Sequence, residues 1–226
     1  MIPIRDVIPS RTRPVVTLGL IAANLLVYLW EMSLPAREAQ AFVFAFGLVP
    51  AHFSTVNLFT SLFVHAGLAH VAGNMLFLWI FGDNVEDRLG HGRFLGFYVI
   101  CGIVAALAQV AWNRAAQTPM VGASGAIAGV MGAYLVLYPQ SRVLMLVPFP
   151  LLLFEVPAAV FLALWFLVQF VSGLGTIATL GAPDVTGGIA FWAHVMGFIA
   201  GLALVRGMRR PERDRVEWWA GDDRVV

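Results

Sequence analysis

The sequence predicts an all-α membrane protein in which six transmembrane helices form one bundle. Hydrophobic residues make up 60% of the 226 residues and charged residues 12%, whereas an ordinary soluble domain carries roughly 25% charged residues. The mean hydropathy is +0.82. Six apolar stretches approach the roughly 20 residues that a helix needs to cross the hydrocarbon core of a bilayer. In chain order they are Val15–Met32, Leu68–Val85, Phe94–Trp112, Gly122–Tyr138, Phe149–Val171 and Thr186–Val205.

The first stretch follows a short segment, residues 1–14, that resembles the basic start of a secretion signal. Arg5, Arg11 and Arg13 supply its positive charge. A signal peptide ends at a cleavage site of small residues, whereas this stretch ends in Glu31 and Met32. We therefore expect the first stretch to stay in the protein as a membrane anchor.

The segment between the first two stretches, Ser33–Gly67, is apolar but does not offer a continuous crossing. It is rich in phenylalanine, and Pro50, Ser54, Thr55 and Asn57 interrupt it. Irregular backbone at membrane depth needs protein or water around its polar groups. We expect this segment to lie in the membrane interface or to re-enter the membrane against the other helices.

The remaining connections are polar or rich in glycine. The second stretch leads into charged residues that we expect to be solvated, namely Asp83, Glu86, Asp87 and Arg88. The loop between the fifth and sixth stretches should be mobile, because it contains Gly173, Gly175, Gly181, Gly187 and Gly188. The charged tail, residues 206–226, is too short to form a domain.

Arginine counts set the orientation in the membrane. An even number of spans places both termini on one side. That side carries twelve arginines, and the opposite side carries two, Arg37 and Arg114. Because positive charge accumulates in cytoplasmic segments, both termini are predicted to be cytoplasmic.

Charge and cysteine content exclude several classes of protein. The net charge of +1 leaves no basic face for a nucleic-acid partner. The single cysteine, Cys101, can form no intrachain disulfide and belongs to no CxxC pattern. We expect it to pack as a small apolar residue, and we expect no metal and no cofactor.

Four polar side chains fall at one depth in three helices that run in the same direction. His70 and Asn74 lie in the first two turns of the second stretch, Ser124 in the first turn of the fourth, and His194 about two turns into the sixth. At 1.5 Å per residue, all lie within roughly 15 Å of the outer ends of their helices. Each could be a packing or cross-linking residue alone, but their common depth favours one site.

This combination suits nucleophilic attack on a peptide carbonyl. The Ser124 hydroxyl would be the nucleophile and the His194 imidazole its base. His70 and Asn74, four positions apart on one helix face, and the Ser124 backbone N–H would stabilise the oxyanion. No acidic residue lies near the outer ends of these helices, so the sequence predicts a dyad. Asp184 is the only candidate for a third member, and we disfavour it.

Two pairs of glycines would allow the fourth and sixth helices to approach closely. Gly125 and Gly129 form one small-residue face, and Gly197 and Gly201 form the other. Small residues at this spacing are common where membrane helices pack. The pairs therefore agree with a contact between Ser124 and His194.

Three motifs together are similar to the signature of the rhomboid intramembrane serine proteases. They are His65-x4-His70-x3-Asn74, Gly122-Ala123-Ser124-Gly125 and Ala193-His194-x2-Gly197-x3-Gly201. The resemblance implies a six-span rhomboid-like bundle over residues 15–205 with a membrane-embedded first loop. It also implies that the fifth span is a lateral gate for substrate and that the glycine loop is a cap over the site.

The resemblance further assigns roles to residues and partners. Ser124 would be the nucleophile, His194 its base, His70 and Asn74 the oxyanion donors, and His65 and Gly122 supporting residues. Substrates would be single-span transmembrane proteins in a lipid bilayer. Many members place an aromatic residue one turn after the serine, where this chain has Ala128. Some carry a Trp-Arg pair in the first loop, which this sequence lacks.

Other functions leave different marks on a sequence. A catalytically silent member that binds or escorts membrane helices would not need both Ser124 and His194. A transporter or channel would place charges along a path through the bilayer, and the inner halves of these helices offer almost none. A zinc protease would carry HExxH, which is absent. The compact six-span core suits a prokaryotic inner membrane.

Overall fold

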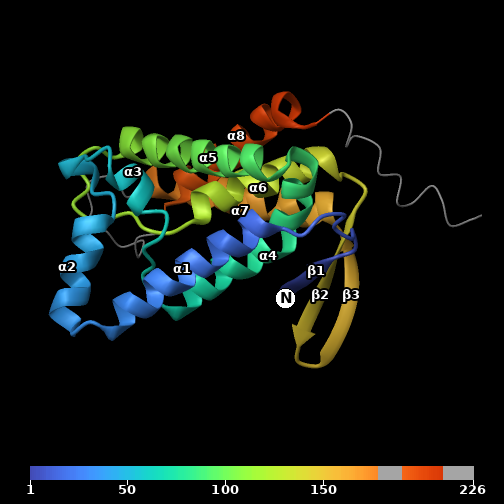
Figure 1. The fold of residues 1–226 in the computed structure, drawn as a ribbon, viewed down its shortest axis with the longest axis horizontal. Coiled ribbons are helices and arrows are strands. Elements are labelled where there is room, and N and C mark those ends of the chain that lie inside the picture. Colours follow the sequence, from blue (N-terminus) through green and yellow to red (C-terminus); the bar gives the residue numbers. More distant parts are fainter. Residues whose placement is uncertain (178–189, 211–226) are drawn as a thin grey trace, which may run out of the picture.

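A computed structural model of the chain describes residues 1–177 and 190–210. The elements in chain order are β1 (Ile2–Asp6), α1 (Val15–Ser33), α2 (Ala36–Phe46), the 3-10 helix η1 (Pro50–His52), α3 (Asn57–Thr60), α4 (Leu68–Leu89), α5 (His91–Trp112), α6 (Ser124–Leu137), β2 (Arg142–Pro148), β3 (Leu151–Pro157), α7 (Ala158–Ile177) and α8 (Phe191–Met208). The long helices lie side by side in one bundle, and the strands lie at one end of it (Figure 1).

The centre of the bundle is α6, which contacts α4, α5, α7 and α8. Every residue from Gly125 to Tyr134 is buried, because glycine and alanine alternate with larger side chains and let the neighbouring helices approach. A 14-residue helix is about 21 Å long, whereas the 22 residues of α5 extend about 33 Å. The N-terminus of α6, where Ser124 lies, is therefore enclosed by its longer neighbours.

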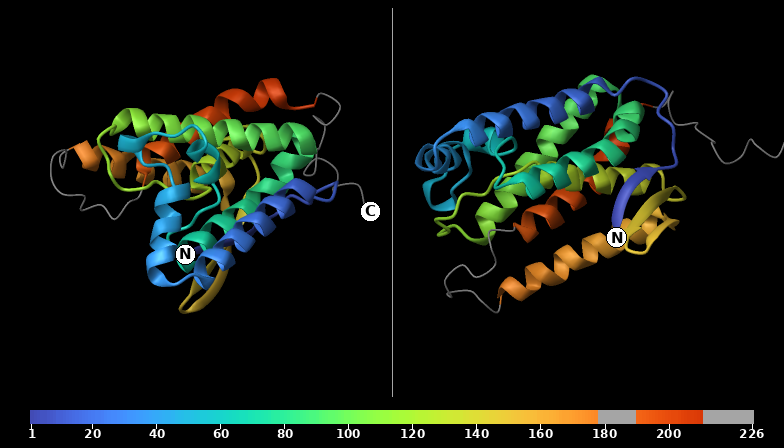
Figure 2. Two further views of the ribbon diagram at one scale, coloured as in Figure 1. Left: turned by 60° about the vertical axis from the view of Figure 1, so that its left-hand side comes forward. Right: turned by 90° about the horizontal axis from the view of Figure 1, so that it is seen from below.

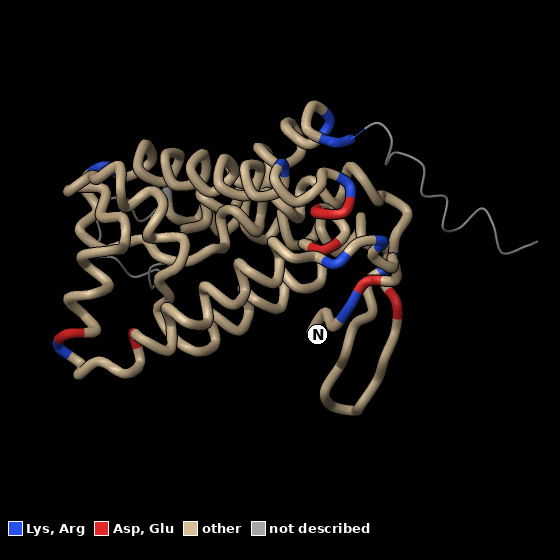
Figure 3. Tube along the Cα trace, in the orientation of Figure 1, with Lys and Arg blue, Asp and Glu red and all other residues tan. Residues whose placement is uncertain are grey.

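The outer helices present apolar side chains to their surroundings. Within residues 1–177 and 190–210, four helices are long and apolar enough to cross a membrane: α1, α5, Ala158–Thr176 of α7, and α8. Only 17% of an 18-residue apolar stretch of α7, and 28% of the corresponding stretch of α1, is buried. These two helices therefore lie at the periphery of the bundle. Charged residues gather near the ends of the molecule and leave a long uncharged middle (Figure 3). This distribution fits a bilayer.

The end of the bundle where β1 lies, which we call the sheet end, differs from the all-α prediction. It carries an antiparallel sheet in the order β1-β2-β3, with Ile2 opposite Leu146 and Leu146 opposite Leu153. The prediction of a helix from Phe149 was wrong, because Pro148, Pro150 and Pro157 disfavour a helix interior. The fifth helix begins at Ala158 instead.

Other boundaries agree more closely with expectation. The first helix ends at Ser33 and the second extends to Leu89. The segment Ser33–Gly67 is broken into α2, η1 and α3, and an isolated bridge joins Leu48 to Met120. Gly173 and Gly175 belong to α7 and not to a loop; the rest of the predicted glycine loop and the tail beyond residue 210 lie outside the described residues.

The charged end of α4 is buried, contrary to the prediction that it is solvated. Glu86 is 0% exposed and Asp87 and Arg88 are each 5% exposed. The Glu86 carboxylate accepts hydrogen bonds from the backbone N–H groups of Val16 (2.9 Å) and Thr17 (2.7 Å) at the start of α1. Thr12, in the segment before α1, donates to Asp87 (2.7 Å). This segment and the start of α1 thus cover the end of α4 and supply the donors that these carboxylates need. Figure 2 shows this segment from two further sides.

Candidate active site

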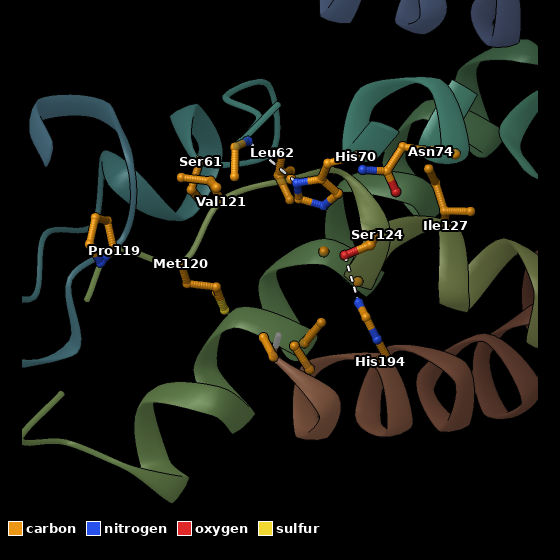
Figure 4. A pocket seen from close by; sticks show the side chains of 18 of the residues that line it. Ser61, Leu62, His70, Asn74, Pro119, Met120, Val121, Ser124, Ile127 and His194 are labelled. Atoms are coloured by element: carbon orange, nitrogen blue, oxygen red, sulfur yellow. Dashed lines mark hydrogen bonds between the residues drawn. The ribbon is translucent and has the colours of Figure 1, made fainter. Parts of the chain in front are cut away.

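Ser124 and His194 meet inside the bundle. Ser124 is the first residue of α6 and His194 lies in the first turn of α8. The His194 Nε2 atom is 2.7 Å from the Ser124 Oγ atom, and the two side chains point toward each other in the lining of a cavity (Figure 4). The predicted pair is therefore at hydrogen-bonding distance, although it is 70 positions apart in the chain.

Glycine contacts between α6 and α8 make this distance possible. A Cβ atom on Gly197 would overlap the carbonyl oxygen of Gly125, and one on Gly201 would overlap that of Gly129. The backbones of the two helices are thus in direct contact at both levels. The glycine pairs in the sequence are the helix-to-helix interface that they were predicted to be.

Gln169 from α7 holds the other side of the His194 ring. Its Oε1 atom lies 2.8 Å from His194 Nδ1. An amide oxygen only accepts hydrogen bonds, so the Nδ1 atom carries the proton and donates it to Gln169. The Nε2 atom then carries no proton and can accept a hydrogen bond from the Ser124 hydroxyl. Sequence reasoning missed Gln169, although a lone amide in the apolar run 158–171 is the kind of residue that marks a site in a membrane helix.

Trp165, also on α7, provides the aromatic neighbour of the His194 ring. The two ring centroids are 5.9 Å apart and the planes are tilted by 40°. Ala128, at the position where many rhomboid proteases have an aromatic residue, is fully buried in the core. The aromatic contact thus comes from a different helix in this chain.

His70 and Asn74 lie on the opposite side of Ser124 from His194 (Figure 4). The Asn74 Nδ2 atom is buried and has no hydrogen-bond partner among the described residues. The His70 Nδ1 atom accepts a hydrogen bond from the Ala66 backbone N–H at 3.4 Å, which places the ring proton on Nε2. Both side chains therefore offer N–H donors beside the serine.

Gly122 is required by the packing of the loop over His70. Its φ is +112°, which other residues rarely adopt. A Cβ atom there would lie 2.7 Å from His70 Cε1 and Nε2. Its N–H donates to the Ser61 carbonyl at 2.8 Å. Gly122 therefore lets the chain pass close to the donor side chains just before α6 begins.

His65 lies behind His70 and not at the serine. It is 0% exposed, and its ring meets that of His70 edge-on at 5.1 Å between centroids. Burial, with a smaller effect of His70, lowers the pKa of His65 to about 4. The ring is therefore neutral at ordinary pH, with its Nδ1 atom 3.2 Å from the Phe63 carbonyl oxygen.

A cavity of about 1180 Å³ surrounds these groups. Ser124, His194, His70 and Asn74 line it, and Trp165 and Gln169 form part of its wall. Asp184, the disfavoured third member, lies outside the described residues. Within residues 1–177 and 190–210, no group of three or more His, Cys, Asp or Glu side chains converges as a metal site would require.

Comparisons with known proteins agree with the resemblance in the motifs. A family model described as the rhomboid domain matches residues 52–211. Rhomboid protein 1, mitochondrial, of Saccharomyces cerevisiae is 25% identical over 206 residues, covering 88% of this chain and 56% of the relative. Presenilin-associated rhomboid-like protein, mitochondrial, of Homo sapiens is 31% identical over 199 residues, covering 83% and 46%.

A bacterial relative matches a shorter region. Rhomboid protease GluP of Bacillus subtilis is 41% identical over 86 residues, which is 38% of this chain and 16% of the relative. The chain spans about half the length of the two mitochondrial relatives.

Proposed function

Because the chain belongs to the rhomboid family, we propose that it is an intramembrane serine endopeptidase that cleaves transmembrane segments of membrane proteins. The observation that carries this proposal is the 2.7 Å contact between His194 Nε2 and Ser124 Oγ. A base on one side of the hydroxyl and N–H donors on the other are what attack on a carbonyl needs.

The first step is the attack of Ser124 Oγ on the peptide carbonyl carbon. His194 Nε2 takes the hydroxyl proton as the new C–O bond forms. The carbonyl oxygen becomes an oxyanion, which the Asn74 amide, the His70 Nε2–H and the Ser124 backbone N–H stabilise. The first backbone N–H groups of a helix have no partner within it, and the dipole of α6 favours negative charge at this end.

The later steps return the proton and release the products. The His194 imidazolium donates its proton to the leaving amine nitrogen as the C–N bond breaks, leaving an acyl group on Ser124. A water molecule then attacks the acyl carbon while His194 takes one of its protons. Collapse of that intermediate returns a proton to Ser124 Oγ and releases the new carboxyl end.

Gln169 is a positioning residue in this scheme. Its amide oxygen fixes the His194 ring and accepts from the imidazolium Nδ1–H, the task of the aspartate in a Ser–His–Asp triad. A carboxylate in this low-dielectric place would carry a desolvation penalty of several kcal/mol. A neutral amide supplies the acceptor without that penalty.

The proposal places α1, α4, α5, α6, α7 and α8 across the membrane as a six-span catalytic core, residues 15–205. The arginine distribution favours cytoplasmic termini, which puts Ser124 beneath the extracytoplasmic face. His65 and Gly122 support His70 and the loop before α6. The relatives that cover most of the chain are mitochondrial, so the comparisons give no support to the predicted prokaryotic inner membrane.

Labelling and cleavage by the purified protein test the proposal. A fluorophosphonate probe should label the wild type, and the wild type should cleave a single-span model substrate; Ser124→Ala should abolish both. Ser33→Ala is the matched control and should behave as the wild type, because it removes an exposed serine hydroxyl that, among the described residues, donates to the Trp30 carbonyl alone. Cleavage by Ser124→Ala at the wild-type rate would refute the assignment. Substrate binding without labelling or cleavage by the wild type would favour a catalytically silent escort.

A further inference from the structure

The β2–β3 hairpin carries an apolar surface that the bundle does not cover. Residues 143–154 contain only apolar side chains. At its tip Phe149 is 92% exposed, Leu151 77% and Leu153 60%. Every residue from Leu151 to Glu155 is exposed, so both faces of β3 are open. Contiguous apolar surface of this kind marks a contact with a partner or a membrane.

The hairpin is attached to the bundle at the level where the membrane-spanning helices end. It joins the C-terminus of α6 to the N-terminus of α7. β1 pairs with β2 from Ile2 to Asp6, and Asp6 Oδ2 accepts hydrogen bonds from Tyr134 of α6 (2.5 Å) and Asn84 of α4 (2.9 Å). The sheet is therefore fastened to two helices of the bundle.

The direction of the hairpin keeps it close to that level. Figure 1 shows β2 and β3 running across the long axis of α5 and not continuing it away from the bundle. The hairpin also leads directly into α7, whose outer side is apolar, with Leu164 57% and Val168 59% exposed. The only charges on the hairpin, Arg142 and Glu155, form an ion pair at its base (3.5 Å).

We propose that the tip of the hairpin, residues 147–154, inserts into the lipid leaflet at the sheet end of the bundle. The lipid is the occupant because the tip is an uncharged, exposed apolar surface at the level where the helices end, and because the chain continues from it into α7, a helix that is apolar and long enough to cross a membrane. This inference rests on the membrane location of the family and does not depend on catalysis.

The open edge of β3 sets the depth of insertion. Unpaired backbone N–H and C=O groups do not occur next to lipid in the hydrocarbon core. β3 is an edge strand in the part of the chain that the structure describes, since only β2 pairs with it there. Its outer backbone groups must therefore reach water or lipid headgroups, so the tip lies at the shallow, interfacial part of the leaflet with its side chains turned toward the acyl chains.

Spin labels on the full chain in phosphatidylcholine vesicles test the proposal. Cys101, the only cysteine, is replaced by alanine, and Phe149→Cys or Leu151→Cys then carries the label. The matched control is Arg5→Cys, an exposed position on β1 of the same sheet. Labels at 149 and 151 should collide several-fold more with oxygen than with a water-soluble nickel complex, and the label at 5 should show the reverse. Lipids labelled near the headgroup should broaden the tip signals more than lipids labelled near the chain end.

Two results would overturn the proposal. Labels at 149 and 151 that are as accessible to nickel as the label at 5 would place the tip in water. Labels inaccessible to both reagents would place it against another protein surface, such as β3 of a second copy. Two tip positions are labelled so that the proposal can still be tested if one of the two variants does not fold. Cleavage by the unlabelled wild type in the same vesicles is independent of the label readout, so its absence alongside lipid-exposed labels would count against the proposed function only.

Discussion

At the scale of single residues, His194 is fixed from two sides by uncharged partners. The Ser124 hydroxyl faces its Nε2 atom and the Gln169 amide oxygen faces its Nδ1 atom, at 2.7 and 2.8 Å. The two hydrogen bonds define both the tautomer and the plane of the ring. Because none of the three groups is charged in the resting state, the site can be assembled at membrane depth without an ion that must be desolvated.

Removing the Gln169 acceptor should slow catalysis and leave the fold in place. A hydrogen bond to a charged group contributes about 1.5–3 kcal/mol, so Gln169→Leu should lower kcat roughly 10–150-fold because the imidazolium loses its acceptor. Gln169→Glu keeps an acceptor of the same reach and should retain more activity than the leucine variant, because a carboxyl group that is protonated in this low-dielectric place avoids the desolvation penalty and still presents a carbonyl oxygen. Steady-state cleavage by purified variants in vesicles measures both, and KM should change little.

Gln109→Leu is the matched control for this prediction. It removes an amide from α5 whose Oε1 atom has no partner among the described residues, so activity should be unchanged. An equal loss of kcat in Gln109→Leu and Gln169→Leu would contradict the positioning role, as would a glutamate variant no better than the leucine variant.

The sequence allowed Ser124, His194, His70 and Asn74 to be predicted because they share one depth and known motifs. Gln169 could not be placed in the same way. It lies on a helix that runs in the opposite direction, so its distance from the outer surface depends on where the helix begins. That start was predicted at Phe149 and found at Ala158, which shifts every depth along α7.

At the scale of elements, the contact between α6 and α8 determines whether the serine and histidine meet. Both helices present glycine where they cross, and the backbone of each fills the space that a side chain would need. Phe198 of α8 approaches Gly132 of α6 in the same way, through its backbone carbonyl. The interface therefore has no room for adjustment by side-chain rotation alone.

Gly201→Ala should separate these helices and reduce both stability and activity. Its Cβ atom would overlap backbone atoms of Gly129, and overpacking of this kind typically costs about 1–3 kcal/mol. Thermal unfolding in detergent and the cleavage rate measure the two effects. Gly96→Ala on α5, where a Cβ atom meets no described atom within 4 Å, should leave both unchanged or slightly raise stability. Equal behaviour of the two variants would show that the contact is not tight.

The helices α1, α4, α5, α6 and α8 were predictable to within a few residues because apolar length is a strong signal. The strands were not, because a short apolar run can be a strand or part of a buried helix, and periodicity alone does not distinguish them. The three prolines around the hairpin, Pro148, Pro150 and Pro157, were the available sign that the helix begins later.

At the scale of the whole molecule, the N-terminal segment fastens the sheet end together. It supplies β1, and its hydroxyls bind two carboxylates at the end of α4: Ser10 to Asp83 (2.5 Å) and Thr12 to Asp87 (2.7 Å). The prediction that the end of α4 is solvated was wrong because the hydrogen-bond partners of its carboxylates lie about 70 residues away in the chain. Local charge patterns say nothing about such distant donors.

Asp6 should make the stability of this end depend on pH. Burial, with the nearby Asp83 carboxyl adding to it, raises the pKa of Asp6 to about 7. The folded state therefore binds a proton that the unfolded state, with an ordinary aspartate pKa of 3.8, has lost. The resulting stabilisation is complete below pH about 4 and disappears as the pH rises through about 7. The unfolding temperature should fall between pH 5.5 and 8.5.

Asp6→Asn should flatten that dependence, because the amide has no proton to lose in this range. Thermal unfolding of both proteins across the pH range is the measurement. Glu38→Gln, which changes an exposed carboxylate on α2, serves as the control and should keep the wild-type slope. An unchanged slope in Asp6→Asn would assign the pH dependence to another group.

Through Gln169, the orientation of His194 depends on a helix at the periphery of the bundle. The amide that orients His194 lies on α7, a peripheral helix, while Ser124 and His194 lie on two helices locked together by glycine. An outward swing of α7 that widened the way into the cavity would withdraw both Gln169 and Trp165 from the imidazole. A peptide would then enter while α7 is displaced, and its bond would break only after α7 has returned, because His194 is oriented by Gln169 and Trp165 only in that position.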